Sequence, residues 1–426
     1  MNGIPIPSKA AEPILDILRV YIDESAALWE VRSRLVKDPH VTLHSLGRHD
    51  QRLAAHLDGL AVAGEEGWPL CIEALKSPSD GAVFAPAIRV LEEKRQDRLE
   101  PLLGVCRTAP TAHRGLISAF GWMERDALQD TVSTLLNSDD PLAALVSLAA
   151  CSLHRVDPGN VLDTRVRNAH PAVRARALRA AGELGRRDLL TAITAALADD
   201  DPACQFWTAW SAVMLGDRNL ALRALTGNAM RPGPFRSRAF RLALQAMPIS
   251  AAHAMLQELA KGGGAESWVI EGSGIAGNAG YVPWLIAQMN APETARRAGE
   301  AFSLITGIEL GQAGLDRQRP ANLAAGPNED AGDPDVDLNP DDGLPWPDPD
   351  RVQRWWEANT SRFETGQRYF MGAPVTHAHC IDVLQHGCQR QRILAAHYLR
   401  LLDPGTPLFN TSAPAWRQQR LLAKMR

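Results

Sequence analysis

The sequence predicts an all-α solenoid of stacked helical hairpins, followed by a small helical module at its C-terminal end. The first observation is a proline that follows a short polar turn and precedes an Ala-, Leu- and Arg-rich stretch, and that recurs at intervals of 30 to 32 residues. The second is that apolar residues within each stretch are spaced as on one face of a helix. Regular spacing of this kind is typical of solenoids. The recurring residues are Pro78, Pro110, Pro141, Pro171, Pro202 and Pro234.

After Pro234 the next clear match is Pro292, which lies two periods further on, so one marker is missing near Ala265. A proline at the first helical position is preorganised for a helix, and an Asp or Ser before it can cap free amides. Each period therefore predicts two helices. One hairpin cannot bury both of its faces alone, so neighbouring hairpins must stack.

The clearest hairpin starts at Pro171. Its first helix has an apolar stripe, and Gly185 is expected to end that helix. A second stripe follows, after which three aspartates turn the chain toward Pro202. The first stripe is Val173, Ala177, Ala180, Ala181 and Leu184, and the second is Leu189, Leu190, Ile193, Ala196 and Leu197.

Composition narrows the class of protein. The chain of 426 residues is 45% hydrophobic and 22% charged, which is globular composition. Its net charge of -4 gives no overall attraction to nucleic acid, so a nucleic-acid partner is not expected. The six cysteines are scattered without C-x-x-C spacing and are read as reduced core thiols. Because neither a secretory signal nor a long apolar stretch occurs, the expected location is the cytoplasm, without a membrane.

The hairpin that starts at Pro171 resembles the short HEAT-like repeats of bacterial proteins such as phycobilin lyases. The resemblance is good over residues 141 to 226 and weaker toward residues 78 and 310. It implies a curved solenoid that binds protein. It is carried by His170, Pro171, Arg174, Ala177, Ala180, Leu184 and Gly185.

Four further segments resemble a proteobacterial family of HEAT-like proteins that is associated with type VI secretion gene neighbourhoods. They are Arg52 to Leu60, Ile305 to Leu310, Leu344 to Asn359, and Pro404 to Gln418. This family implies no activity, and no functional residues are carried over from it.

Prolines, glycines and breaks in the helical pattern divide the chain into four ranges. Residues 1–65 are expected to form an N-terminal helical cap, in which Leu53, His56, Leu57 and Leu60 share one helix face. Residues 66–310 are expected to form the HEAT-like repeat array. Residues 311–350 are an acidic, proline-rich loop or linker that cannot continue a helix. Residues 351–426 are expected to return to helix as a C-terminal module.

One glycine motif matches the pattern of a cofactor-binding turn. Gly272, Gly274 and Gly277 follow the G-x-G-x-x-G pattern of dinucleotide-binding turns, but that motif needs a strand before it and a βαβ unit around it. In repeat register, Gly277 ends a first helix instead. We therefore expect no cofactor.

Two groups, one of histidines and cysteines and one of histidines alone, are candidate metal sites. Zinc needs four ligands aimed at one point, whereas His377 and His379 differ in direction by about 200° on a helix. We expect ordinary helix residues, no metal and no catalytic set. The first group is His377, His379, Cys380, His386 and Cys388, and the second is His40, His44, His49 and His56.

The acidic linker permits two readings. Asp337, Asn339, Asp341 and Asp348 occupy positions of a calcium loop, but the required glycine is replaced by Asp342. The favoured reading is a solvated tether that lies on a basic face of the array.

Arginines on successive hairpins outline such a basic face. With Trp207 and Trp210 nearby they could suit a nucleic-acid backbone, but most are expected on solvated helix faces, and both tryptophans are expected in the core. The arginines are Arg174, Arg176, Arg179, Arg186, Arg187, Arg218 and Arg223.

The resulting hypothesis is a non-enzymatic scaffold whose concave side, lined by second helices, grips a protein partner. The expected partner is a secreted effector or a secretion spike component, and the expected role is that of an adaptor. An immunity protein that binds a toxin and a HEAT-like DNA glycosylase stay open as alternatives. Partner contacts are assigned to Arg187, Arg218, Arg223, Trp346, Trp355 and Trp356, the tryptophans either docking the linker or anchoring the partner.

Overall fold

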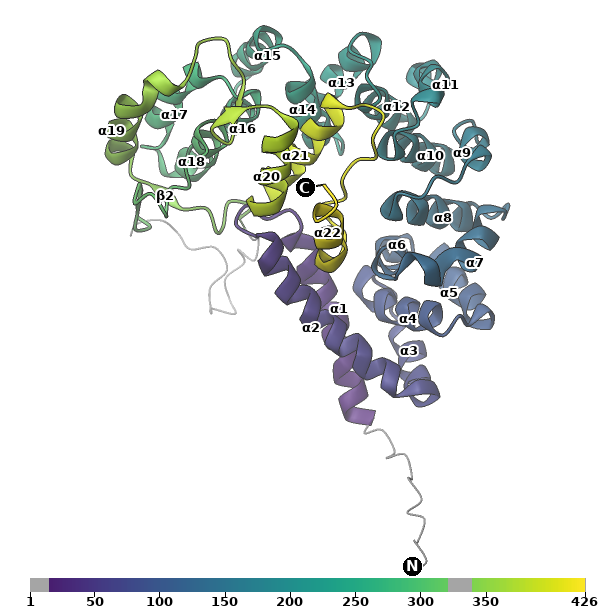
Figure 1. Cartoon of the computed structure of the whole chain (residues 1–426). Coiled ribbons are helices and arrows are strands. Elements are labelled where there is room, and N and C mark those ends of the chain that lie inside the picture. The colour runs from purple at the N-terminus through teal and green to yellow at the C-terminus, as the bar shows by residue number, and fades with distance from the viewer. Residues whose placement is uncertain (1–14, 321–338, 426) are drawn as a thin grey trace, which may run out of the picture. The chain divides into compact units, whose positions relative to one another are not determined.

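The computed structural model describes residues 15–320 and 339–425, and these residues are almost entirely helical (Figure 1). They form 22 α-helices and two pairs of two-residue strands. The all-α solenoid class is therefore confirmed. Contacts divide the chain into two compact units, one of residues 1–34 and 46–150 and one of residues 35–45 and 151–426.

The first unit begins with two long helices and continues with shorter hairpins. The apolar face of α2 is buried, with Leu53, Leu57 and Leu60 all inside the core. Helices α4 and α6 pack side by side as the first helices of successive hairpins. The elements are α1 (Leu15–Leu35), α2 (Leu43–Val62), α3 (Trp68–Ala74), α4 (Asp80–Glu92), α5 (Gln96–Thr108), α6 (His113–Trp122), α7 (Arg125–Leu136) and α8 (Pro141–His154), whose last turn belongs to the second unit.

The second unit contains the most regular hairpins. Its first helices pack against one another in sequence, α10 on α12 and α16 on α18, with α14 between them (Figure 1). The hairpin helices are α9 (Asn160–Arg165), α10 (Pro171–Leu184), α11 (Leu190–Thr194), α12 (Pro202–Met214), α13 (Leu220–Met230), α14 (Arg236–Ala246), α15 (Ile249–Lys261), α16 (Glu266–Ala276), α17 (Val282–Gln288) and α18 (Pro292–Thr306).

The predicted helix starts and ends are confirmed at several positions. Pro171, Pro202 and Pro292 occupy the first turn of their helices, and α16 starts directly after Ala265, where the missing marker was expected. Gly185 ends α10 in the left-handed conformation, with φ of 84°. The predicted second helix after Gly185 is less regular than expected, because 3₁₀ turns flank the short α11.

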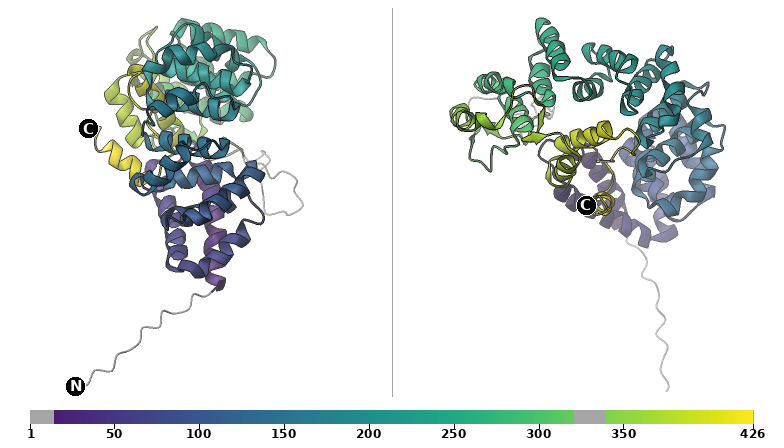
Figure 2. Two further views of the ribbon diagram at one scale, coloured as in Figure 1. Left: turned by 90° about the vertical axis from the view of Figure 1, so that its right-hand side faces the viewer. Right: turned by 45° about the horizontal axis from the view of Figure 1, so that its top comes forward.

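The C-terminal residues of the second unit lie inside the row of hairpins. Helices α20 (His377–His386), α21 (Gln389–Leu402) and α22 (Ala415–Leu422) appear on the inner side, whereas α11, α13 and α15 lie outside (Figures 1 and 2). Helix α19 (Pro349–Asn359) packs on α17. Strand β1 (Asp316–Arg317) pairs with β2 (Trp346–Pro347), and β3 (Tyr369–Phe370) pairs with β4 (Ala373–Pro374), both antiparallel.

First helices, not second helices, therefore face the interior of this unit, so the predicted lining of the concave side is wrong. The reason is the composition of the two helices. The first helices α10, α12 and α14 are buried on most of their faces, whereas the second helices bury a single stripe. Only a helix that is apolar on more than one side can pack both on its neighbours and on an inner layer.

Candidate interaction surface

The inner face of the second unit binds a helix of its own chain. Helix α21 packs against α12 and α14. Gln245 of α14 donates to the Leu394 carbonyl at 2.9 Å and lies 3.0 Å from Nδ1 of His397. Tyr398 donates to the Ile275 carbonyl at 3.2 Å. Burial lowers the pKa of His397 to about 4, so this imidazole is neutral in the interface.

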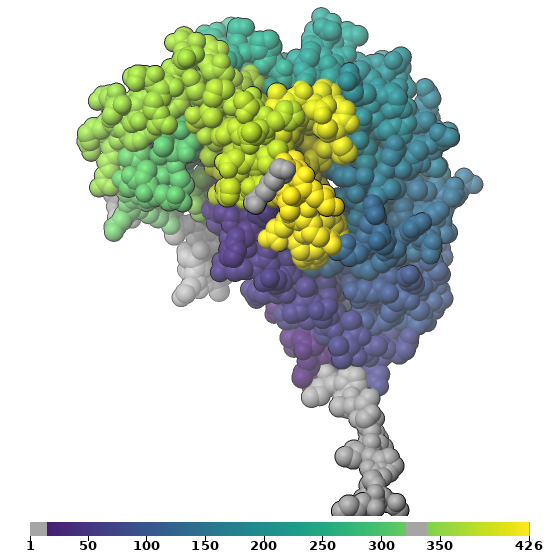
Figure 3. Space-filling view, viewed as in Figure 1, coloured from purple at the N-terminus to yellow at the C-terminus, as the bar shows by residue number. Residues whose placement is uncertain are grey.

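An extended segment, residues 404–411, then follows α21 across the ends of three hairpins. The Leu408 amide donates to the Glu183 carbonyl at 2.8 Å, and Asn410 donates to the Leu153 carbonyl at 3.3 Å. Arg155 donates to the Leu408 carbonyl and Arg400 to the Thr406 carbonyl. In Figure 3 this segment, in yellow, lies directly against the blue and teal surface of the repeats.

Gly185 permits this close approach. A Cβ at that position would lie 2.7 Å from the Gly405 carbonyl oxygen, and its positive φ already disfavours other residues. The glycine that ends α10 therefore also makes room for the segment 404–411.

A buried charge cluster lies beneath this segment. Glu183 accepts from Arg176 at 2.5 Å and from Arg179 at 2.8 Å, and its side chain is only 8% exposed. Burial by itself would raise the pKa of Glu183, but Arg179, Arg176 and Arg155 together lower that pKa far below its usual range. Glu183 is therefore a carboxylate in the folded protein.

Most arginines of the predicted basic face are neutralised by carboxylates. Arg174 pairs with Asp199 at 2.7 Å, and Arg186 pairs with Asp157, Asp163 and Asp188. Together with the Glu183 pairs, these contacts leave little uncompensated charge on the face. A phosphate backbone would have to compete with five carboxylates for these guanidinium groups.

The three arginines assigned to partner contacts differ in their surroundings. Arg187, beside the 3₁₀ turn that precedes α11, and Arg223, on α13, are exposed. Arg218 is half-buried and donates to the Val213 carbonyl at 2.6 Å, within its own hairpin connection. Arg187 and Arg223 thus present their charges to solvent, and Arg218 is engaged locally.

The three tryptophans assigned to partner contacts lie against their own unit. The Trp346 ring is 5.0 Å from the Arg296 guanidinium carbon, and Trp355 packs edge-to-face on Phe302 at 5.6 Å. Trp356 is buried in the core that contains Val352 and Tyr369. In this structure they dock α19 and the end of the linker onto the hairpins. Trp207 and Trp210 are buried, as predicted.

Contacts between arginine and tryptophan side chains link successive first helices, and the sequence reasoning did not predict them. Arg176, Trp207, Arg238 and Trp268 follow one another at intervals of 30 or 31 residues on α10, α12, α14 and α16. The Trp207 ring lies 4.5 Å from the Arg179 guanidinium and 5.7 Å from that of Arg238. The repeat register of 30 to 31 residues was the signal that could have revealed this pattern.

The glycine motif is structural. Gly277 ends α16 with φ of 68°, as predicted, and the residues before Gly272 are helical rather than a strand. A Cβ on Gly274 would lie 2.7 Å from the Ala301 Cα atom, so this glycine lets α16 and α18 approach closely.

The histidine and cysteine groups do not converge on one point. His379 contacts the Phe370 carbonyl at 2.7 Å, His386 contacts Asp382 at 3.0 Å, and His49 contacts the Leu28 carbonyl at 2.8 Å. Cys380 is buried in the core. Within residues 15–320 and 339–425, no three His, Cys, Asp or Glu side chains are grouped so that they could hold a metal ion.

Two of the candidate calcium ligands in the linker make other contacts. Asp341 is ion-paired with Arg297 at 2.8 Å, and Asp348 caps α19 by accepting from the Arg351 amide at 3.1 Å. Asp337 lies outside the described residues. The described end of the linker does lie on arginines, but these are Arg296, Arg297 and Arg390 rather than the predicted set.

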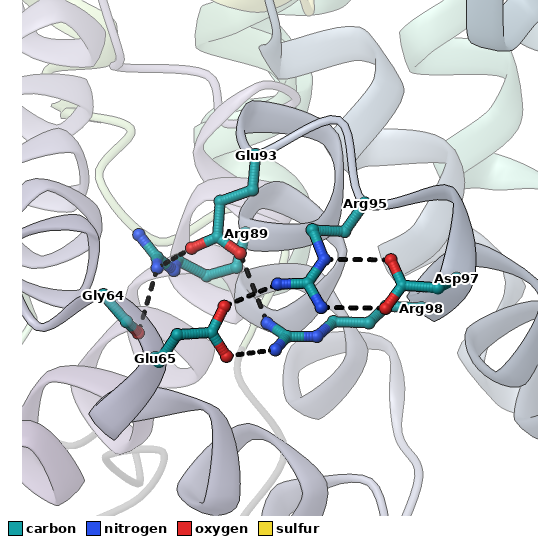
Figure 4. Close-up of polar contacts among 7 residues, drawn as sticks. All are labelled: Gly64, Glu65, Arg89, Glu93, Arg95, Asp97 and Arg98. Atoms are coloured by element: carbon teal, nitrogen blue, oxygen red, sulfur yellow. Dashed lines mark hydrogen bonds and ion pairs between the residues drawn. The ribbon is translucent and has the colours of Figure 1, made fainter.

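The first unit carries a different arginine network, in which the carboxylates Glu65 and Asp97 are exposed (Figure 4). Glu65 accepts from Arg95 and Arg98, Glu93 accepts from Arg89 and Arg98, and Asp97 accepts from Arg95 at 2.8 Å. The Glu65 side chain is 68% exposed. The Arg98 guanidinium lies 4.2 Å from the Trp68 ring.

Among the residues that the structure describes, no helix combines the length and the apolar character needed to cross a membrane.

Comparison with known proteins supports the repeat assignment. A family model of HEAT repeats matches residues 160–245, which run from the start of α9 to the last turn of α14. No curated protein and no solved structure matched the chain at the significance required. The matched region is the stretch in which first and second helices alternate most regularly. The chain is similar to HEAT repeats over these residues, and this likeness supports a HEAT-like repeat protein.

Proposed function

We propose that this protein is a non-enzymatic scaffold that binds another protein. HEAT repeats commonly serve protein interaction, and one observation supports that role here. The hairpins of the second unit already hold a helix and an extended segment of their own chain, through carbonyl, amide and arginine contacts. A surface that binds polypeptide in cis has the chemistry to bind polypeptide in trans.

The specific role we propose is that of an adaptor or accessory protein in type VI secretion effector delivery, located in the cytoplasm. Its partner would be a secreted effector or a spike component. This proposal rests on the resemblance of four sequence segments to proteobacterial HEAT-like proteins associated with such gene neighbourhoods. Stacked hairpins supply the large surface that tight binding of a folded partner needs.

The proposed contact residues lie in two places. Arg187 and Arg223 are exposed, and we expect them to steer and orient the partner. Arg218, Trp346, Trp355 and Trp356 pack on their own unit and would contact a partner only through their exposed edges. The four ranges remain our proposal for the domain organisation: a helical cap of residues 1–65, a repeat array of residues 66–310, a linker of residues 311–350 and a helical module of residues 351–426.

Affinity purification from the native host tests the scaffold role. The tagged full-length chain should retain a type VI effector or spike component in stoichiometric amount under mild conditions. The double variant R187E/R223E should lose that partner, whereas R125A, which removes an exposed arginine of the first unit, should keep it. Recovery of the chain alone in several conditions would contradict the proposal.

The two alternatives give different results. An immunity protein would retain a toxin and protect cells that express it. A HEAT-like DNA glycosylase would retain duplex DNA, so a DNA mobility shift that is lost between about 50 and 200 mM salt would replace the scaffold by a nucleic-acid function.

A further inference from the structure

A crevice lined by three arginines and three carboxylates lies on the inner face of the second unit. It has a volume of about 260 Å³ and lies between α14, α16, α18 and α21. Three arginines from three different helices line it, namely Arg241, Arg297 and Arg390, and Trp268 lines it from α16. Arginine and tryptophan are enriched at the centres of protein interfaces because they combine large contact area with directional polar groups.

A short piece of the chain forms part of the wall of this crevice, because Pro340 and Asp341 line it. The Asp341 carboxylate accepts from Arg297 Nε at 2.8 Å and lies 3.9 Å from Arg390 Nη1. Arg390 also donates to the Pro340 carbonyl. Two arginines from α18 and α21 thus bind a carboxylate and the peptide carbonyl just before it, so the crevice recognises an acidic peptide by its backbone as well as by its charge.

Neighbouring contacts extend this recognition to a second carboxylate. Asp342 pairs with Arg296 at 2.9 Å, and its side chain is 57% exposed. The Asp341 amide donates to the Asn339 side chain at 2.9 Å, which fixes the turn that presents both carboxylates. Residues 339–342 are therefore a bound example of an acidic turn held by arginines.

Two further arginines lie beyond the residues that the turn covers. Arg241 lines the crevice from α14 and pairs with Glu271 at 2.8 Å. Arg236 covers the Trp268 ring at 4.3 Å. Arg390 pairs with Glu300 at 2.7 Å and still lies 3.9 Å from the Asp341 carboxylate. An incoming carboxylate would therefore share Arg241 and Arg390 with their present partners, as Asp341 shares Arg390 with Glu300.

We propose that this crevice is the docking site for an acidic, Asp- or Glu-bearing segment of the partner protein, and that Pro340 and Asp341 hold its arginines in cis, with Asp342 bound beside it on Arg296, until such a segment displaces them. The inference rests on the proposed scaffold function and specifies the chemistry of the partner. Because an occupant on the same chain has a high effective concentration, it lowers the apparent affinity for a segment in trans.

Fluorescence anisotropy with the full-length chain tests this proposal. The probe is a labelled peptide of residues 339–348, and its neutral counterpart has asparagine in place of each aspartate. The variant D341N/D342N should bind the acidic probe at least about fivefold more tightly than the unchanged chain, because its cis occupant is weakened. D350N removes an exposed carboxylate outside the crevice and should bind like the unchanged chain.

Arginine variants locate the binding site. R297A and R390A should each weaken probe binding by about tenfold, whereas R125A should not change it. If D341N/D342N lowers the unfolding midpoint, D342N alone takes its place, because the Asp342 carboxylate is mostly exposed.

Three results would overturn the proposal. The first is equal binding of the acidic and neutral probes, and the second is equal binding by D341N/D342N and D350N. The third is tighter, Arg297-dependent binding of a single-stranded DNA oligonucleotide, which would assign the crevice to nucleic acid. None of these results changes the host capture by Arg187 and Arg223, so the docking proposal and the scaffold function can fail separately.

Discussion

Two arginine and carboxylate networks, one in each unit, use the same residue types in opposite environments. In the second unit Glu183 is buried beneath residues 404–411 and is held by Arg176 and Arg179. In the first unit Glu65 is largely exposed and bridges Arg95 and Arg98 (Figure 4). Burial makes the loss of one partner costly, because a charge without its counterion cannot be solvated, whereas water replaces a partner at the surface.

The largest effect is expected from Glu183→Gln. Removing this carboxylate leaves the Arg176 cation, whose side chain is only 11% exposed, buried without an anion, and we expect a loss of about 3–5 kcal/mol in the free energy of unfolding, measured by urea denaturation. The matched variant Glu65→Gln should leave the unfolding midpoint unchanged within error. Equal losses for the two variants would show that the two networks do not differ in this way.

One ion pair of the buried network could be expected from the sequence. Arg179 and Glu183 are four residues apart on a predicted helix, so their pairing could be expected from local spacing. The cover by residues 404–411 could not be expected, because that segment lies more than 200 residues away in the sequence. Local periodicity predicts which helix a residue belongs to, and not what lies over that helix.

The same limit applies to the crevice. The acidic linker was predicted to lie on a basic face, and its described end does contact arginines. The predicted arginines were those of the regular hairpins near Pro171, which pair with carboxylates such as Asp199 and Glu183 instead. Arg390 could not be assigned to the face from sequence, because it reaches the crevice only through the folding back of α21 onto α14.

A smaller effect is expected from Arg400→Leu, which tests how residues 404–411 are held over the buried Glu183 cluster. Arg400 donates to the Thr406 and Gly182 carbonyls, so its loss leaves two acceptors unsatisfied, at a cost of about 1–3 kcal/mol. Amide hydrogen exchange should accelerate in residues 404–411, and Leu408 reports it directly. Arg95→Leu, in the exposed network, is the matched control and should leave exchange in that segment unchanged.

A still smaller effect is expected from Arg98→Met in the first unit. The Arg98 side chain is only 10% exposed. Its guanidinium also stacks on an aromatic ring, at 4.2 Å from Trp68. Loss of the stacking and of the pairs with Glu65 and Glu93 should cost about 1 kcal/mol, measured by urea denaturation. The cost should fall in 0.5 M NaCl if ion pairing contributes to it; a loss as large as that of Glu183→Gln would contradict the contrast.

The smallest effect is expected when the pH is lowered moderately. The folded-state pKa of Glu183 lies below its ordinary value of 4.5, because Arg179, Arg176 and Arg155 outweigh the burial that would raise it. A lowered folded-state pKa means that the stabilising contribution is complete above the unfolded pKa and is lost only as the pH falls toward the folded value. The difference in urea midpoint between the unchanged chain and Glu183→Gln should therefore stay constant from pH 7 to about pH 5 and narrow below that, while persisting at pH 3. Closure of that difference by pH 4 would mean that Glu183 gains no more from its arginines than an exposed carboxylate does, and the distinction between the two networks would then disappear.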